Sequence, residues 1–105
     1  MEKSERILGM LSLSRKAGKL ICGFDAVKEQ LTKNADVSVY IASDVSEKTA
    51  KEMRFLTEKY GAALYGLPMT MPQIGSITGR LNGVLCVTEK NLAKKINGII
   101  VEQTL

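Results

Sequence analysis

The chain has 105 residues, and 15 Lys and Arg against 11 Asp and Glu give it a net charge of +4 at neutral pH. With no histidine and only two cysteines, it can build neither a histidine-based catalytic triad nor a four-ligand Cys/His zinc site. No apolar run approaches the ~20 residues that span a membrane. We therefore expect a single domain over residues 1–105, located in the cytoplasm, with an anionic partner and with no metal, cofactor or membrane bound.

Helix and strand patterns alternate along the chain. The expected elements are a helix over 4–17, a strand over 19–22, a helix from 23 to about 34, a strand over 37–42, a helix from 43 to 60, a strand over 62–65, a short helix from 70 to about 78, a strand over 84–87 and a helix from 88. Beyond Gly98 the pattern leaves strand and helix open. Short connections between alternating elements predict an α/β fold, a three-layer α/β/α sandwich around a small, mainly four-stranded mixed sheet.

Polar residues and glycines mark the ends of these helices. The expected caps are Ser4, Asp44 paired with Glu47, Thr70 paired with Gln73, and Thr88. Gly18 and Gly61 are placed to end helices, because glycine readily takes the left-handed conformation found there. Lys94 and Lys95 are expected near the negative C-terminal end of the last helix.

The segment Gly18 to Asp25 is the most informative for chemistry, because it is expected to bring a strand end, a glycine and a helix N-terminus together. A helix N-terminus offers unpaired N–H groups and a partial positive charge, which suits a phosphate. Gly23 has no Cβ, so a nucleic-acid backbone or base can approach it closely. The other interpretation is that Gly23 only serves the turn. The cations that could surround it are Arg15, Lys16, Lys19 and Lys28.

Two further features of the second half are open to more than one interpretation. Gly75 and Gly79 on a short helix permit either tight packing or a close ligand, and packing is favoured. The stretch Gly61 to Gly79 has no charged side chain, although the protein is basic. Such a segment is either buried or a contact surface, and burial is the commoner explanation.

Several residues of types that occur in catalytic, metal or binding sites are better explained by a structural role. Asp44 and Glu47 favour helix capping over metal binding. Cys22 and Cys86 lie at or near strands, where a free cysteine usually behaves as a small apolar residue. Phe24 can stack on a base or pack against the sheet, and packing is slightly favoured.

Taken in order, six stretches carry a resemblance to a known family. They are Leu8 to Lys19, Gly23 with Val27, Val39 to Ser46, Ile74 to Gly79, Val84 to Val87, and Leu92 to Lys95. Together they resemble the kink-turn-binding ribosomal-protein superfamily of the L-seven-Ae and L-thirty-e type, and within it the small bacterial YlxQ-type branch. The resemblance covers nearly the whole chain, and the shared order of the motifs makes it specific.

The resemblance implies an α/β/α sandwich that binds RNA bulges and internal loops of the kink-turn kind. The surface that it implies consists of the glycine-opened second helix and the loop before the last strand. Carried over by position, the RNA-binding residues are Lys19, Gly23, Phe24, Asp25, Lys28 and Glu29 on one side, and Thr78, Gly79, Arg80, Leu81 and Asn82 on the other.

Two of the positions at which the chain departs from the family pattern directly follow Phe24. Kink-turn binders of this family show Gly-x-Asn-Glu, in which the glutamate pairs with a guanine edge. Here Asp25 and Ala26 take the places of the asparagine and the glutamate. An ionised Asp25 accepts hydrogen bonds but donates none, so its contact with a base would differ from that of asparagine.

The expected function is therefore that of a non-enzymatic RNA-binding protein that is ribosome-associated or translation-related. Its expected partners are structured RNA, above all ribosomal RNA, and ribosomal proteins. The alternative is a protein-interaction or assembly module of the same fold that has weakened or lost kink-turn recognition. The absent glutamate and the uncharged Gly61 to Gly79 stretch favour this alternative.

Overall fold

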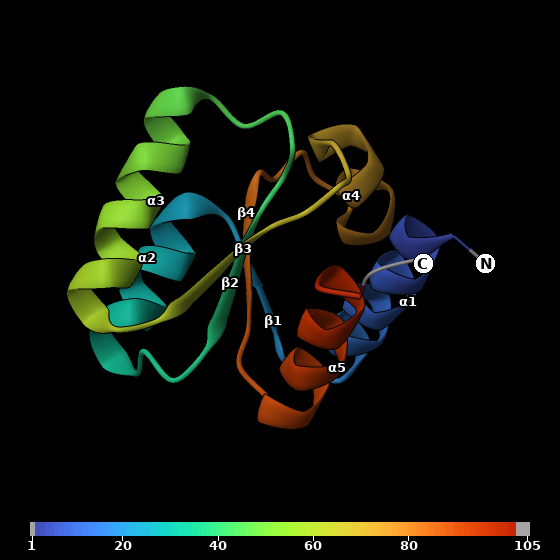
Figure 1. Ribbon diagram of the computed structural model, residues 1–105, viewed down its shortest axis with the longest axis horizontal. Coiled ribbons are helices and arrows are strands. Elements are labelled where there is room, and N and C mark those ends of the chain that lie inside the picture. Colours follow the sequence, from blue (N-terminus) through green and yellow to red (C-terminus); the bar gives the residue numbers. More distant parts are fainter. Residues whose placement is uncertain (1, 103–105) are drawn as a thin grey trace.

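A computed structural model describes residues 2–102, and this part of the chain forms five helices and four strands (Figure 1). They are α1 (Lys3–Lys16), β1 (Leu20–Cys22), α2 (Phe24–Lys33), β2 (Ser38–Ile41), α3 (Glu47–Tyr60), β3 (Ala63–Gly66), α4 (Met71–Thr78), β4 (Val84–Val87) and α5 (Lys90–Ile100). Every predicted helix and strand is present in the predicted order.

The four strands form one mixed sheet in the order β1-β4-β2-β3. β4 runs antiparallel to both β1 and β2, while β3 runs parallel to β2. β1, β2 and β3 therefore point the same way and β4 points the opposite way. As a consequence, the carboxyl ends of β1 and β2 lie at the same end of the sheet as the amino end of β4.

Helices cover both faces of the sheet, with α2 and α3 on one side and α1, α4 and α5 on the other (Figure 1). Because strand side chains alternate between faces, β2 and β4 feed two separate cores. Tyr40 and Leu85 join the core under α1, α4 and α5, while Val39 and Cys86 join the core under α2 and α3. The predicted three-layer α/β/α sandwich is confirmed.

Burial accounts for part of the uncharged stretch Gly61 to Gly79. Leu67, Met69 and Ile74 are all buried in the core under α1, α4 and α5. Ala63 is exposed, because β3 is the last strand of the sheet.

Capping contacts fix the starts of α3 and α4. The capping box predicted at Thr70 is present, with both of its reciprocal hydrogen bonds. At α3 the predicted pairing of Asp44 with Glu47 was wrong, because Ser46 lies at the N-cap and accepts a backbone N–H of the first turn. Asp44 instead accepts a hydrogen bond from the Met71 N–H at 2.8 Å. This contact ties the loop after β2 to the start of α4.

Two other predicted caps were also wrong. Ser4 lies inside α1, which begins one residue earlier and has no side-chain cap. The Thr88 N–H donates to the Lys19 carbonyl at 2.9 Å, so Thr88 still extends the pairing of β1 with β4. Glu89 caps α5 instead, accepting two backbone N–H groups at 2.7 and 3.1 Å. These hydrogen bonds hold the pKa of Glu89 below its usual value.

The C-terminal segment is helical in the part that the structure describes. α5 continues to Ile100, because Ile96 and Ile99 extend the apolar side that packs on the core. Lys94 and Lys95 therefore lie inside the helix, and the prediction that they lie near its end was wrong. Residues 103–105 lie outside the described residues.

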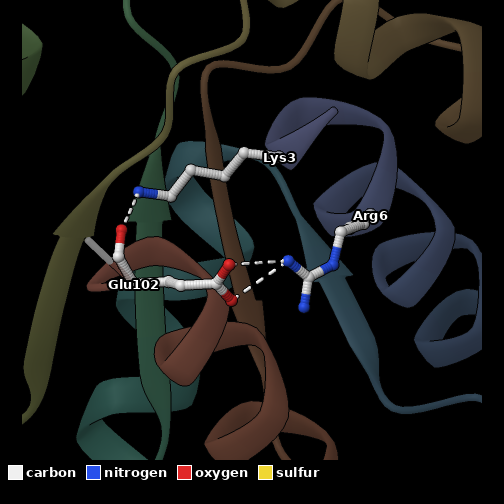
Figure 2. Close-up of polar contacts among 3 residues, drawn as sticks. All are labelled: Lys3, Arg6 and Glu102. Atoms are coloured by element: carbon white, nitrogen blue, oxygen red, sulfur yellow. Dashed lines mark hydrogen bonds and ion pairs between the residues drawn. The ribbon is translucent and has the colours of Figure 1, made fainter. Parts of the chain in front are cut away.

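The first and last helices lie side by side, and polar contacts join their ends (Figure 2). Arg6 Nη1 donates to both carboxylate oxygens of Glu102 at 3.0 Å. Lys3 Nζ donates to the Glu102 carbonyl at 3.0 Å. The Arg6 and Glu102 side chains are 39% and 48% exposed, so solvent screens this pair and its contribution to stability is small.

A chain of partly buried polar side chains connects α5 with β2. The Tyr40 hydroxyl donates to Asn97 Oδ1 at 2.6 Å, and the Asn97 amide donates to Ser38 Oγ at 3.0 Å. Tyr40 is fully buried, and this burial raises the pKa of its hydroxyl. The three groups satisfy one another, which makes the burial of their polar atoms tolerable.

Candidate nucleic-acid interface

The loops at the carboxyl ends of β1, β2 and β3 are hydrogen-bonded to each other and to the start of β4. The Gly23 N–H donates to the Val84 carbonyl at 2.8 Å, and the Ala42 N–H donates to the Gly83 carbonyl at 2.9 Å. The Ser43 N–H donates to the Met69 carbonyl at 2.8 Å. These backbone bonds hold four separate chain segments at one end of the sheet, which we call the loop edge.

A hollow of about 330 Å³ opens at the loop edge, a volume in the range of ligand-binding clefts. Its lining comes from the start of α2, the β2–α3 connection with the first turn of α3, the first residue of α4, and the segment that leads into β4 with the first residue of that strand. The lining residues are Gly23, Phe24, Val45, Ser46, Thr49, Met71, Leu81, Asn82, Gly83 and Val84. The hollow therefore has both apolar walls and polar groups.

Gly23 opens α2 toward this hollow. It is the N-cap of α2 and has φ 103° and ψ 146°, a backbone conformation that is open almost only to glycine. No side chain caps this helix, so the N–H groups of its first turn are left without an intrahelical or side-chain partner. A Cβ at Gly23 would lie 3.9 Å from Asn82 Oδ1, which places Asn82 directly across from the helix start.

The opposite side of the hollow is formed by the loop after α4. A Cβ at Gly75 would lie 3.0 Å from the Arg80 carbonyl, so the helix and the loop pack closely there. This confirms the prediction of packing at Gly75. The same prediction was wrong for Gly79, which ends α4 at φ 79° and where an added Cβ would have no atom within 4 Å. The Thr78 hydroxyl also donates to the Arg80 carbonyl, at 3.0 Å. These contacts hold the loop in place and leave Leu81 71% exposed at its tip.

Gly83 forms the part of the lining that leads into β4. A Cβ at this position would run into Val45 and Met71. The absence of a side chain at Gly83 therefore lets the β2–α3 connection and α4 approach the start of β4. Any larger residue would have to displace two of the residues that line the hollow.

Positive charge lies near the hollow on several elements. Arg15 Nη1 donates to the Ile77 carbonyl at 3.0 Å, which anchors the guanidinium between α1 and α4. Burial raises the pKa of the Cys22 thiol, and the Arg15 charge opposes this effect. Within residues 2–102, Arg80 and Lys28 are exposed and form no ion pair. Both therefore remain available to phosphates.

The structure brings only part of the expected surface together. Of the residues implied by the resemblance, Gly23, Phe24, Leu81 and Asn82 line the hollow. Asp25 is exposed in the first turn of α2, next to Phe24. Thr78, Gly79 and Arg80 form the end of α4 and the loop that leads to Leu81.

Three of the expected residues neither line the hollow nor belong to the segments beside it just described. Lys19 precedes β1, whereas Gly23 follows it, so the strand separates them by ~13 Å. The Lys19 carbonyl accepts a hydrogen bond from the Thr88 N–H, and the charged Lys19 side chain helps to lower the pKa of Glu89. Glu29 forms an ion pair with Lys33 one turn further along α2. Lys28 lies in a separate groove between α2 and α3.

One side of the hollow was not predicted from the sequence. It consists of Val45 and Ser46 from the β2–α3 connection, Thr49 from the first turn of α3, and Met71 from α4. Ligands commonly bind beyond the carboxyl ends of parallel strands in α/β sheets. Knowing that β1 and β2 point the same way would therefore have identified the β2–α3 connection as part of the candidate site. That direction depends on the position of β4 between them, which the sequence pattern does not reveal.

The weaker chemical candidates keep structural roles. Phe24 packs against the core under α2 and α3, as predicted, although it also lines the hollow. Cys22 and Cys86 are free thiols, and burial raises the pKa of Cys86 to about 12. Among residues 2–102, no group of three His, Cys, Asp or Glu side chains could hold a metal ion. Likewise, no helix in this range has the length and apolar character needed to cross a membrane.

Comparison with known proteins confirms the resemblance. No family model matches the chain. The RNA-binding protein YlxQ of Enterococcus faecium is 24% identical over 96 residues, which are 91% of this chain and 92% of that protein. The chain is similar to a YlxQ-type RNA-binding protein over nearly its whole length.

Solved structures share the fold at low sequence identity. A protein of unknown function from Bacillus halodurans superposes with a TM-score of 0.82 at 21% identity, over 91% of this chain and 97% of that one. The 15.5 kD RNA-binding protein of Giardia lamblia superposes with a TM-score of 0.77 at 15% identity, over 95% of this chain and 88% of that one. These neighbours establish that the fold recurs in other proteins.

Proposed function

We propose that the chain is an RNA-binding protein and that RNA occupies the hollow at the loop edge. The observation that carries the proposal is the uncapped start of α2 at Gly23, which faces Asn82 across a hollow with polar groups. The names of the YlxQ relative and of the Giardia neighbour support RNA as the ligand. The net charge of +4 is consistent with a polyanion.

In the proposed complex the hollow takes an unpaired base. RNA-binding proteins read unpaired bases by stacking and by hydrogen bonds to their edges. Phe24 and Leu81 supply apolar contact, and Asn82 offers an amide that both donates and accepts. Free N–H groups at the start of α2 bind a phosphate or a base oxygen. Arg80 and Arg15 hold the flanking phosphates.

We further propose that the RNA has a bulge or an internal loop of the kink-turn kind, because such RNA presents unpaired bases next to a duplex. Ribosomal RNA is the proposed target. The protein would then act in translation, in the cytoplasm, together with ribosomal proteins. Binding and not catalysis is proposed, since the hollow contains no histidine and no paired acidic groups.

The second candidate is an assembly module of the same fold with weakened kink-turn recognition. Asp25 and Ala26 favour it, because they replace the asparagine and the glutamate that the family resemblance implies. Asp25 also adds a negative charge to the first turn of α2, which would oppose a phosphate close by. The two candidates differ in whether binding depends on the bulge.

The test compares a kink-turn RNA with a matched duplex that lacks the bulge, by fluorescence polarisation at about 50 mM and about 200 mM salt. We expect tighter binding to the bulged RNA at both salt concentrations. Equal, weak and strongly salt-dependent binding to both RNAs would favour the second candidate. If the protein binds neither RNA, the proposal that it binds RNA of this class is refuted.

Two charge reversals locate the interface. Arg80→Glu changes the loop beside the hollow, and Lys19→Glu makes the same charge change at the opposite end of β1. We expect Arg80→Glu to lower the affinity for the bulged RNA at least tenfold, a loss of about 1.4 kcal/mol. Lys19→Glu should have a smaller effect that disappears at high salt. An equal effect of both variants would contradict binding at the hollow.

A further inference from the structure

A second concave surface is lined by residues of α2 and α3, the two helices that cover one face of the sheet (Figure 1). It has a volume of about 380 Å³, and we call it the α2–α3 groove. The residues that line it are Phe24, Lys28, Lys51, Glu52, Phe55 and Leu56. The chain has only two phenylalanines, and both line this groove.

Phe55 contributes little to the fold. Its side chain is 64% exposed, and it belongs to neither hydrophobic core of the described residues. The other exposed large hydrophobic residues in residues 2–102 are Leu13, Leu81 and Val101, which are all aliphatic. Within residues 2–102, Phe55 is thus the one aromatic residue whose ring is exposed to solvent and does not pack in either core.

Lysines flank the two rings. Lys28 forms no ion pair within residues 2–102. Lys51 lies 3.6 Å from a carboxylate oxygen of Glu47, but both side chains are more than two thirds exposed, so this contact is weak and easily exchanged. Glu52 is the only acidic residue in the lining, which therefore has a net charge of +1.

The groove and the hollow at the loop edge share one lining residue. Phe24, the first residue of α2, lines both. A strand that leaves the hollow past the start of α2 therefore meets the groove next. Aromatic rings with lysines at their edges are the combination that binds single-stranded nucleic acid, because every base has a face that stacks.

We propose that an unpaired stretch of the same RNA continues from the hollow into the α2–α3 groove. One base stacks on Phe55, and its flanking phosphates lie at Lys28 and Lys51. This inference rests on the proposed function, since it assigns a second contact to the RNA in the hollow. It also gives Lys28 a role that its position outside the hollow would otherwise leave unexplained.

The test uses two RNAs with the same duplexes, and in one of them the internal loop is extended by a few unpaired nucleotides, which we call the tail. Phe55→Ala should lower the affinity for the tailed RNA roughly five- to 150-fold, the range expected for the loss of one stacked base. The affinity for the RNA without a tail should not change. Leu13→Ala is the matched control, because it removes a half-exposed apolar side chain on α1, across the sheet.

A fluorescence measurement reports the stacking directly. The chain has no tryptophan, so Phe55→Trp introduces a single indole into the groove. We expect tailed RNA to quench this fluorescence and RNA without a tail to leave it unchanged. Phe55→Trp should also retain the affinity that Phe55→Ala loses, because the indole restores a stacking surface.

The possible outcomes separate this inference from the proposed function. If the wild-type protein binds neither RNA, the proposed function fails. If it binds both equally, and Phe55→Ala and the indole signal show no effect of the tail, RNA binding stands and the groove assignment is overturned. The assignment is also overturned if Phe55→Ala abolishes a concentration-dependent self-association of the free protein in sedimentation, because the groove would then be a protein contact.

Discussion

Gly23 allows a test of the backbone geometry on which the candidate interface depends. Its φ of 103° and ψ of 146° lie in a region that costs a residue with a Cβ about 1–3 kcal/mol. Steric clash adds little, because the nearest atom to a new Cβ would be Asn82 Oδ1 at 3.9 Å. Gly23→Ala also restricts the unfolded chain, which returns about 0.4–1 kcal/mol. The net loss of unfolding free energy should be about 1–2 kcal/mol.

Gly9→Ala is the matched control with the opposite sign. Gly9 lies inside α1, and a Cβ there would have no atom within 4 Å. Alanine is the better helix former by about 0.5–1 kcal/mol, so this variant should be more stable than the wild type. Two identical substitutions are thus expected to shift stability in opposite directions.

Urea denaturation followed by circular dichroism measures both effects. For a domain of this size, each 1 kcal/mol also shifts the melting temperature by roughly 4–8 °C. Binding of the bulged RNA by folded Gly23→Ala should weaken as well, because the start of α2 must move. If Gly23→Ala is as stable as Gly9→Ala, Gly23 does not have the proposed backbone conformation, and the argument for an opened helix start fails.

Three further predictions concern buried and capping groups. Tyr40→Phe leaves Asn97 Oδ1 without its donor and should lower the unfolding free energy by about 1–3 kcal/mol in urea titrations, whereas no change would mean that water replaces the hydroxyl. Because burial raises the pKa of Cys86 to about 12, this thiol should react with a disulfide reagent at pH 8 only as fast as the protein unfolds, and fast reaction would contradict its burial. Glu89 has a lowered pKa in the folded state, so its contribution to stability is complete above about pH 4.5 and is lost as the pH falls further. Glu89→Gln should therefore flatten the acid dependence of the unfolding free energy, measured by urea titrations between neutral and acidic pH. An unchanged profile would contradict the capping role.

The alternation of elements could be predicted because each strand and each helix carries its own local signal. Val39 and Tyr40 indicate a buried strand, and the apolar spacing of Val27 and Leu31 indicates one buried side of a helix. The capping residues were less predictable. Thr88 fits a cap by residue type, yet its N–H is used by the sheet, and the capping position moves to Glu89. A cap depends on where the sheet ends, and this is a property of the tertiary structure.

The candidate site could be predicted only from its contiguous parts. Gly23 and Asn82 each stand out through the family resemblance, but their approach across the hollow depends on β4 lying beside β1. The same strand order brings in Val45 and Ser46, for which residue-level reasoning gave no signal beyond helix capping. The separation of Lys19 from Gly23, in contrast, follows from β1 itself, a strand that the sequence predicts.

The loop edge also suggests how RNA binding could persist when base-reading side chains change. The N–H groups at the start of α2 belong to the backbone, and Gly23 presents them whatever residues follow it. Backbone donors recognise phosphate and carbonyl oxygen without depending on side-chain identity. Asp25 and Ala26 would therefore alter which base is preferred more than whether RNA is bound. In the proposed complex, affinity comes from the opened helix and the surrounding cations, and the two replaced side chains determine how closely the preferred RNA must resemble a kink-turn.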